Sequence, residues 1–401
     1  MLAPNHRATI DATLPVVAAN ATAITGRFYE RMLGAHPELR NLFNQGNQAS
    51  GEQKQALAGA VYAYAQHCDT PAAIEPLLNR IAHKHASLGI SADMYTIVGR
   101  HLMAAIGEIL GDAVTAEIAE AWDTVYWRFA GELIAREAVL YQDAGITPAS
   151  FLREYEVVER VAEGDVAVSL RLAPTDDAPP PAFKPGQYVS VQVELPEISL
   201  RQLRQYSLSD AADGKTLRIT VKREVGDDAR PNGLVSTHLA RHAETGSRWL
   251  VSNPFGDLAL DTGATTPVVM VSAGVGVTPL HAMRRHLARH QPQRRGVFVH
   301  VAAHGGRHIL KRELDAATQI DDLIVYDAAR SEDRLGSDHH HAGRFALAEH
   351  AATIVRPDAD YYLCGPLPFM TAQRDALLGQ GVAAKRVHFE VFGPDLLTAT
   401  L

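Results

Sequence analysis

The sequence predicts a multidomain chain of three successive folds: an all-α domain, an antiparallel β-barrel, and an α/β domain with a doubly wound parallel sheet. Three changes in the spacing of apolar residues predict this order. Apolar residues recur every three or four positions through residues 1–140 and alternate with polar or small residues from about 166 to 221. After 263 they form short continuous runs. Such spacings are typical of helices, of strands with one buried face, and of strands buried on both faces.

The same spacings predict the boundaries between the domains. We expect a helical domain over 1–140 with breaks at Pro37 and Pro71, a linker over 141–150, a barrel over 151–262 and an α/β domain over 263–401. Buried parallel strands are predicted at Val268–Val271, Val297–Val301, Leu323–Tyr326, Tyr361–Cys364 and Val387–Val391. Helices are predicted between most of them, at Pro279–His290, Ile309–Thr318 and Pro366–Leu378.

Composition excludes several classes of protein. The chain has 401 residues and a formal net charge of −8, with no basic tract, which argues against a nucleic-acid partner. No uncharged apolar window reaches the roughly 18–20 residues of a membrane span, and the first 24 residues lack a signal-peptide core. Two distant cysteines suggest buried thiols in a reducing compartment, so a cytoplasmic protein is expected.

A histidine and a carboxylate dominate the helical part. His85 ends one apolar segment, and alone such a histidine is usually structural. Ser91 then precedes a predicted helix on whose apolar stripe Tyr95 lies. Glu137 occupies the next position of another stripe, four residues after Leu133, where an apolar side chain is expected. It either reaches water at the helix end or, because burying an unpaired charge is costly, has a partner such as the ring N–H of a metal-bound His85.

The helical part resembles the globin domain of the bacterial and yeast flavohemoglobins. The resemblance rests on the spacing of eight residues: Tyr29, Phe43, Gln53, Leu57, Lys84, His85, Tyr95 and Glu137. It implies that His85 is the proximal ligand of haem b iron, with Tyr95 and Glu137 orienting it. It also implies that Tyr29 and Gln53 line the distal side, that Leu57 restricts the pocket, and that Lys84 lies beside the haem edge.

Three strings in the barrel region resemble the flavin domain of the ferredoxin-reductase family. They are Pro185–Tyr188, Arg204-Gln205-Tyr206-Ser207, and the Gly233–Leu239 segment that contains Ser236. An Arg-x-Tyr-Ser string alone is weak. The resemblance implies that Arg204 binds the FAD pyrophosphate, that Tyr206 packs on the isoalloxazine, and that Ser207 approaches its reactive edge. Guanidinium and the N–H groups at a helix start both favour phosphate.

Two later strings resemble the nicotinamide and flavin sites of the same reductases. The turn after the first parallel strand runs through Gly274, Val275, Gly276, Val277, Thr278 and Pro279, and Pro279 is expected to open a helix. Near the C-terminus stand Glu390, Val391, Phe392, Gly393 and Pro394. The resemblance implies that the first string binds NAD(P)H and that Phe392 covers the flavin; the alternative for Phe392 is ordinary core packing.

Two further strings are interpreted as solvated surface. His339–His341 lies beside Asp338 and would suit a metal, but a solvated loop is favoured. Arg284–His286 is interpreted as a solvated helix face.

The resemblance covers the full chain and implies a nitric oxide dioxygenase that detoxifies NO. Electrons would pass from NAD(P)H to FAD and then singly to haem, because flavin accepts two electrons together and releases them one at a time. Two alternatives remain open: an oxygen-binding or sensing globin with a built-in reductase, and a reductase of alkyl or lipid hydroperoxides. The expected partners are O₂ and NO, and the apolar pocket lining also suits a lipid tail.

Overall fold

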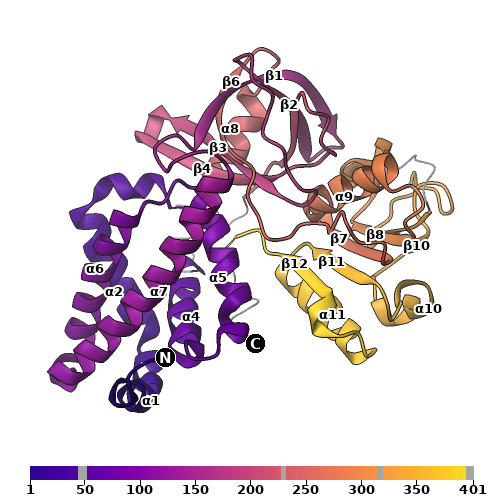
Figure 1. The fold of residues 1–401 in the computed structure, drawn as a ribbon. Coiled ribbons are helices and arrows are strands. Elements are labelled where there is room, and N and C mark those ends of the chain that lie inside the picture. Colours follow the sequence, from indigo (N-terminus) through magenta and orange to yellow (C-terminus); the bar gives the residue numbers. More distant parts are fainter. Residues whose placement is uncertain (44–51, 227–231, 314–318, 394–401) are drawn as a thin grey trace. The chain divides into compact units, whose positions relative to one another are not determined.

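A computed structural model describes residues 1–43, 52–226, 232–313 and 319–393. The chain divides into two compact units. The first holds Met1–Phe151, Glu194–Leu203 and the chain from Gly393 on, and the second holds Leu152–Val193 and Arg204–Phe392. Helices come first, then an antiparallel sheet, then a parallel sheet (Figure 1), which confirms the predicted order of folds.

The helical part is a bundle of long helices around one apolar core. Its elements are α1 (Pro4–Ala19), α2 (Ala21–Ala35), η1 (Pro37–Asn41), α4 (Glu52–His67), α5 (Pro71–Ala86), α6 (Ala92–Leu110), η2 (Gly111–Ala113) and α7 (Ala116–Asp143). Pro37 and Pro71 occupy first turns, as the predicted breaks require. Ser91 is the N-cap residue of α6, although its side chain makes no cap hydrogen bond.

In the described residues, no helix combines the length and the apolar character that crossing a membrane requires. Helix α7 runs to Asp143, three residues beyond the predicted end of the helical domain, and β1 begins at Leu152. A short segment of the barrel sequence belongs to the helical unit. Arg201 donates its backbone N–H to Asn41 Oδ1 at 2.9 Å, and the Gln202 amide donates to the Arg40 carbonyl at 3.1 Å.

The antiparallel sheet closes on itself. Its order is β4-β3-β6-β1-β2-β5, from β1 (Leu152–Glu163), β2 (Ala167–Pro174), β3 (Tyr188–Leu195), β4 (Leu200–Ser207), β5 (Leu217–Lys222) and β6 (Arg248–Ser252). A bridge between Leu208, directly after β4, and Ile219 in β5 joins the two ends of this order. Helices η3 (Pro196–Ile198) and α8 (Leu234–His242) complete this part of the chain.

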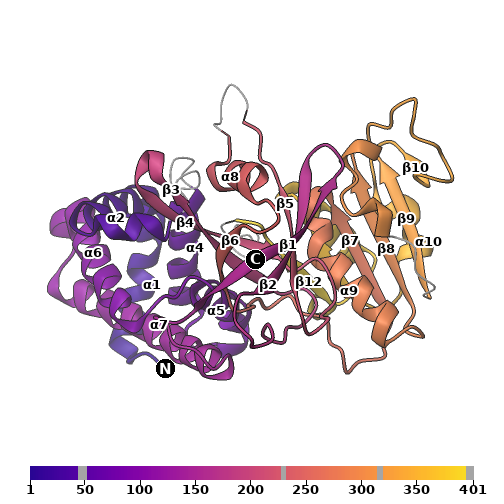
Figure 2. The ribbon, with the colours of Figure 1, turned by 90° about the horizontal axis from the view of Figure 1, so that it is seen from above.

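The parallel sheet has the order β10-β9-β8-β7-β11-β12, and Figure 2 labels its strands other than β11. Its strands are β7 (Val268–Ala273), β8 (Gly296–Ala302), β9 (Ile320–Tyr326), β10 (His341–Ala342), β11 (Asp360–Cys364) and β12 (Val387–Glu390). Met270 packs in one core with Leu280 of α9 (Val277–His290), whereas Val271 packs in another with Leu377 of α11 (Leu367–Gly379). Both faces are therefore covered, as in a doubly wound sheet.

Short helical turns fill the connections of this domain. They are η4 (Gly274–Gly276), η5 (Gly305–Arg307), η6 (Lys311–Glu313), η7 (Leu347–His350), α10 (Ala351–Ile354) and η8 (Ala384–Arg386). The predicted helix at Ile309–Thr318 is wrong in its described part, which contains only the 3-10 turn η6; residues 314–318 lie outside the described residues.

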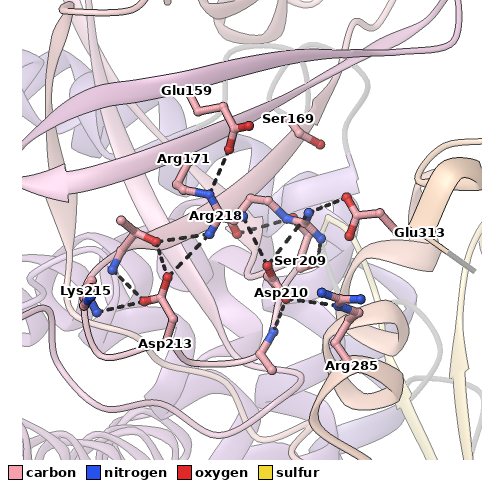
Figure 3. Close-up of polar contacts among 12 residues, drawn as sticks. Glu159, Ser169, Arg171, Ser209, Asp210, Asp213, Lys215, Arg218, Arg285 and Glu313 are labelled. Atoms are coloured by element: carbon pink, nitrogen blue, oxygen red, sulfur yellow. Dashed lines mark hydrogen bonds and ion pairs between the residues drawn. The ribbon is translucent and has the colours of Figure 1, made fainter. Parts of the chain in front are cut away.

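A network of ion pairs joins β5 and its loop to the α/β part (Figure 3). Arg218 donates to Glu313 at 2.6 Å, and Asp210 accepts from Arg289 at 3.0 Å and from Arg285 at 3.4 Å. Burial opposes ionisation of Asp210, but Arg218, Arg289 and Arg285 outweigh it and lower its pKa. The antiparallel and parallel sheets thus form one compact unit held together by charges that sequence spacing does not reveal.

Two of the predicted solvated strings are partly buried. Arg284 is 2% exposed and donates to Asp322 at 2.9 Å, beneath the helix face that the prediction assigned to solvent. His339 is 3% exposed and stacks on Tyr326, with ring centroids 4.8 Å apart. The solvated interpretation is therefore wrong for both residues. Arg284 pairs with Asp322 and His339 stacks on Tyr326, and both of these partners belong to strand β9.

Candidate functional site

His85, near the end of α5, forms a hydrogen-bonded triad with two buried residues, Tyr95 and Glu137. His85 Nδ1 lies 2.8 Å from Glu137 Oε1 and 2.8 Å from the Tyr95 hydroxyl, and Tyr95 also donates to Glu137. Glu137 is 3% exposed and Tyr95 is 6% exposed. The structure therefore shows the pairing that the interrupted apolar stripe of α7 predicted, and excludes a carboxylate that reaches water.

The donors in this triad can be assigned. Burial, reinforced by the charge of Glu137, raises the pKa of the Tyr95 phenol, so it remains a protonated donor. Glu137 then accepts from Tyr95 and from His85 Nδ1–H, which leaves Nε2 as the free lone pair of the ring. Within the described part of the chain, Nε2 has no hydrogen-bond partner. The ring is therefore held in one orientation, and its Nδ1–H tautomer leaves Nε2 available to a metal ion.

A further residue supports this triad, although sequence reasoning did not single it out. The Tyr126 hydroxyl donates to the backbone carbonyl of Tyr95. A Cβ on Gly99 would lie 2.4 Å from the Tyr126 ring, so the absence of a side chain there makes room for it. The only sequence signal was a tyrosine beside an apolar stripe, which is too common to be informative.

A second group of side chains gathers around Tyr29, in α2. Tyr29 is 5% exposed, and its ring contacts those of Phe28 and Phe43, with centroids 4.8 and 5.5 Å away. Gln53 hydrogen-bonds to its hydroxyl, but burial dominates and raises the pKa of Tyr29. The structure thus brings Tyr29 and Gln53, the two residues predicted to line the distal side, together with Phe43, and keeps the phenol protonated, as a hydrogen-bond donor must be.

Leu57, predicted to restrict the distal pocket, borders a small apolar cavity of about 40 Å³ with Ile24, Leu102 and Trp122. Neither Tyr29 nor Gln53 is among the residues that line this cavity. Lys84, one residue before His85, donates from Nζ to the Gly393 carbonyl at 2.7 Å. Gly393 belongs to the same compact unit as Lys84, so this hydrogen bond lies within the helical unit.

The Arg204–Ser207 string forms the end of strand β4. Burial lowers the pKa of the Arg204 guanidinium to about 10, so it retains its positive charge near neutral pH. The Gln205 amide donates to Ser190 Oγ at 3.2 Å, and Ser207 is 5% exposed. A partly desolvated cation on a rigid strand fits an anionic ligand group such as a pyrophosphate.

Tyr188 and the Gly233–Ser236 turn belong to the same barrel. Tyr188 begins β3 and is 7% exposed. Gly233 precedes the first residue of α8, and Ser236 Oγ accepts the Glu224 N–H at 3.2 Å and donates to the Gly233 carbonyl at 3.3 Å. The serine hydroxyl thus shapes the turn, which leaves backbone N–H groups of the helix start as phosphate donors.

The glycine-rich turn connects β7 to α9. A Cβ on Gly276 would lie 2.3 Å from the carbonyl oxygen of Cys364, at the end of β11. Only glycine lets these two strand ends approach so closely, which is the geometry of a dinucleotide crevice at the carboxyl edge of a parallel sheet. Helix α9 begins at Val277, so the expectation that Pro279 opens it is wrong by two residues. Thr278 Oγ1 donates to the Val275 carbonyl at 3.0 Å.

The C-terminal string leaves strand β12 at Glu390. Phe392 is 46% exposed, which excludes core packing and leaves an aromatic face available to a planar ligand. Gly393 is described, whereas Pro394 lies outside the described residues.

Family models match both ends of the chain. The globin model matches residues 26–133, and the oxidoreductase NAD-binding domain model matches residues 270–375. Full-length relatives are also found. Flavohemoproteins from Bordetella pertussis and Chromobacterium violaceum are 46% and 45% identical to the chain, which covers 99% and 98% of their lengths; each alignment spans 98% of this chain.

Two solved structures are similar. Flavohemoglobin from Malassezia yamatoensis, determined with bound FAD and haem, has a TM-score of 0.84 and 31% identity, with 98% of this chain and 100% of that chain covered. The FAD/NAD-binding domain of nitric oxide dioxygenase from Vibrio cholerae has a TM-score of 0.54 and 34% identity, with 60% of this chain and 99% of that chain covered. Together with the full-length relatives, these matches show that the chain belongs to the flavohemoprotein family, as an NAD(P)H-dependent flavohaem oxidoreductase with haem, FAD and NAD(P)H as its cofactors.

Proposed function

We propose that the protein is a nitric oxide dioxygenase, which uses NAD(P)H and O₂ to convert NO to nitrate. One observation carries this proposal: the buried Glu137 carboxylate accepts a hydrogen bond from His85 Nδ1. An anionic partner makes an imidazole a stronger electron donor to iron, which suits redox chemistry of O₂ better than its reversible carriage.

The chain's own residues divide the work between its two units. FAD, when bound, accepts a hydride from NAD(P)H and passes single electrons to haem, which supplies the redox chemistry of O₂ and NO. His85 would hold the iron and Tyr29 and Gln53 would donate hydrogen bonds on the opposite side. Arg204 and the Gly233–Ser236 turn would bind phosphate groups of FAD, and the turn at Gly276 would admit the dinucleotide.

The similar FAD/NAD-binding domain from Vibrio cholerae belongs to a nitric oxide dioxygenase, which supports this proposal. The two alternatives differ from this proposal in the substrate that is turned over with NAD(P)H. A carrier or sensor would not turn over NAD(P)H with NO, and a hydroperoxide reductase would turn it over with alkyl hydroperoxide in preference to NO.

The test is steady-state oxidation of NAD(P)H by the full-length holoprotein in O₂ with pulses of NO. We expect oxidation that depends on NO, nitrate as product, and two NO consumed per NAD(P)H, because a hydride carries two electrons and each conversion takes one. Nitrate formation no faster than without the protein would refute the proposal, and faster turnover with alkyl hydroperoxide would favour that alternative.

Replacing Tyr29 with phenylalanine should accelerate O₂ dissociation. The variant keeps the ring that packs on Phe43 but removes the donor, and a hydrogen bond to a group with anionic character contributes about 1.5–3 kcal/mol, or roughly ten- to a hundredfold in rate. Carbon monoxide is less polarised, so its dissociation should change far less. Both rates are measured by stopped flow, with Val139→Ala, at a 54% exposed position of α7, as control. Equal changes for both gases would indicate pocket shape, and no change would remove Tyr29 from the site.

Replacing Arg204 with alanine should weaken FAD binding by roughly ten- to a hundredfold, the value of one charge-assisted hydrogen bond of about 1.5–3 kcal/mol. Haem content should stay unchanged because its residues lie in the other unit. Flavin fluorescence during dilution measures the affinity. Arg248→Ala removes an arginine that is 59% exposed on the same barrel and should have no effect. Unchanged FAD affinity in the Arg204 variant would contradict its assignment.

A further inference from the structure

Three metal-ligating side chains meet at the outer edge of the parallel sheet, away from the residues assigned above. His341, Glu349 and His350 each offer one ligand atom, and these atoms all lie within 4.8 Å of one another. His341 comes from β10, the edge strand, and the other two from the turn η7. We call this group the edge cluster.

The backbone fixes His341 from both sides. The neighbouring His340 donates its N–H to the Ile324 carbonyl at 2.8 Å, and Gly343 donates to the Tyr326 carbonyl at 2.9 Å. Both acceptors belong to β9, so β10 cannot rotate about its own axis without breaking the ladder. The side chain of His341 therefore points consistently toward η7.

The ring of His350 is also held in one orientation. It stacks on Phe345, with centroids 5.6 Å apart and an interplanar angle of 9°, and it meets the His341 ring edge to face at 5.2 Å. Phe345 and Leu347 are buried in the core of this sheet face and so anchor the turn. His350 Nε2 is buried and has no hydrogen-bond partner in the described residues. Such an atom costs free energy unless a ligand satisfies it.

The donor set indicates which ion the edge cluster would bind. Two imidazoles and one carboxylate match the ligands of Zn²⁺, whereas Mg²⁺ and Ca²⁺ prefer oxygen alone and Cu(I) prefers sulfur. Glu349 is exposed and can rotate to close the coordination sphere. We propose that His341, Glu349 and His350 bind one Zn²⁺ ion, with water as a fourth ligand, and that this ion ties edge strand β10 to η7.

The test is titration of the full-length holoprotein with ZnCl₂ by isothermal calorimetry, together with zinc X-ray absorption. We expect one site whose affinity falls by at least about tenfold in Glu349→Gln and in His350→Gln, because even outer partners of metal ligands contribute ten- to a hundredfold. X-ray absorption should show imidazole nitrogens at about 2.0–2.1 Å from zinc. Binding should also raise the thermal midpoint, since a ligand of the folded state stabilises it.

A matched control is His290→Gln. His286 and His290 form another histidine pair, with ring centroids 4.7 Å apart on α9, and His290 is exposed. This change should leave the zinc site intact. Equal zinc affinity in the wild type, Glu349→Gln and His350→Gln would overturn the proposal. So would loss of the site in His290→Gln alone, absence of imidazole nitrogen from the absorption spectrum, or tighter binding of Mg²⁺ than of Zn²⁺.

Discussion

Replacing His85 with alanine is expected to abolish stable haem binding through iron and reduce NO-dependent NAD(P)H oxidation to background. The change removes the only imidazole that the structure presents with Nδ1 held by Glu137, so the iron loses its protein ligand. NAD(P)H-driven reduction of an artificial electron acceptor should remain, because Leu152–Val193 and Arg204–Phe392 form a unit with cores of its own. Haem and flavin spectra and the acceptor assay measure the two halves separately.

The variant also leaves Glu137 buried, with Tyr95 as its only hydrogen-bond partner among the residues that the structure describes. A hydrogen bond to a charged group contributes about 1.5–3 kcal/mol, so a lower thermal midpoint of the helical unit is expected even if the fold persists. His67→Ala, at the end of α4, is the control and should retain haem and activity. Loss of acceptor reduction in a folded His85 variant would show that the two functions are not separable.

Replacing Gly276 with alanine should slow flavin reduction by NAD(P)H by about a hundredfold, the cost of roughly 1 Å of misplacement between reacting groups. The added Cβ would lie 2.3 Å from the Cys364 carbonyl oxygen and 2.6 Å from the Gly365 nitrogen. Both are backbone atoms at the end of a central strand, so the turn must move away from its crevice. Anaerobic stopped flow, which follows flavin bleaching, measures the rate; haem content should be unchanged.

Gly379→Ala is the matched control for this prediction. Gly379 ends α11 in the same domain and has no atom within 4 Å of the position of an added Cβ. It should keep full flavin reduction. A Gly276 variant that reduces its flavin as fast as the wild type would show that the turn tolerates a side chain and that the dinucleotide lies elsewhere.

The sequence determined the order of folds and indicated that Glu137 pairs with His85. The period of the apolar residues, and not their identity, predicted the helices. One interruption of that period, at Glu137, predicted a buried carboxylate with a hydrogen-bonding partner. The reason is physical: a charge in an apolar stripe is costly unless paired, so its presence implies its companion. The resemblance implied that the turn around Gly276 binds NAD(P)H, and the absence of a side chain there suits a close approach of the backbone to a ligand.

The tertiary structure alone decided what depends on contacts between distant segments. Arg284 was expected on the surface, but Asp322 lies 2.9 Å from it across 38 residues and makes its burial possible. The bridge between Leu208 and Ile219 and the pairing of Asp210 with Arg289 are equally invisible to local spacing. The edge cluster joins His341 to Glu349 and His350 through the chain reversal around Phe345. Local periodicity reports which face of an element is buried, whereas the identity of the group opposite that face is fixed only when the chain folds.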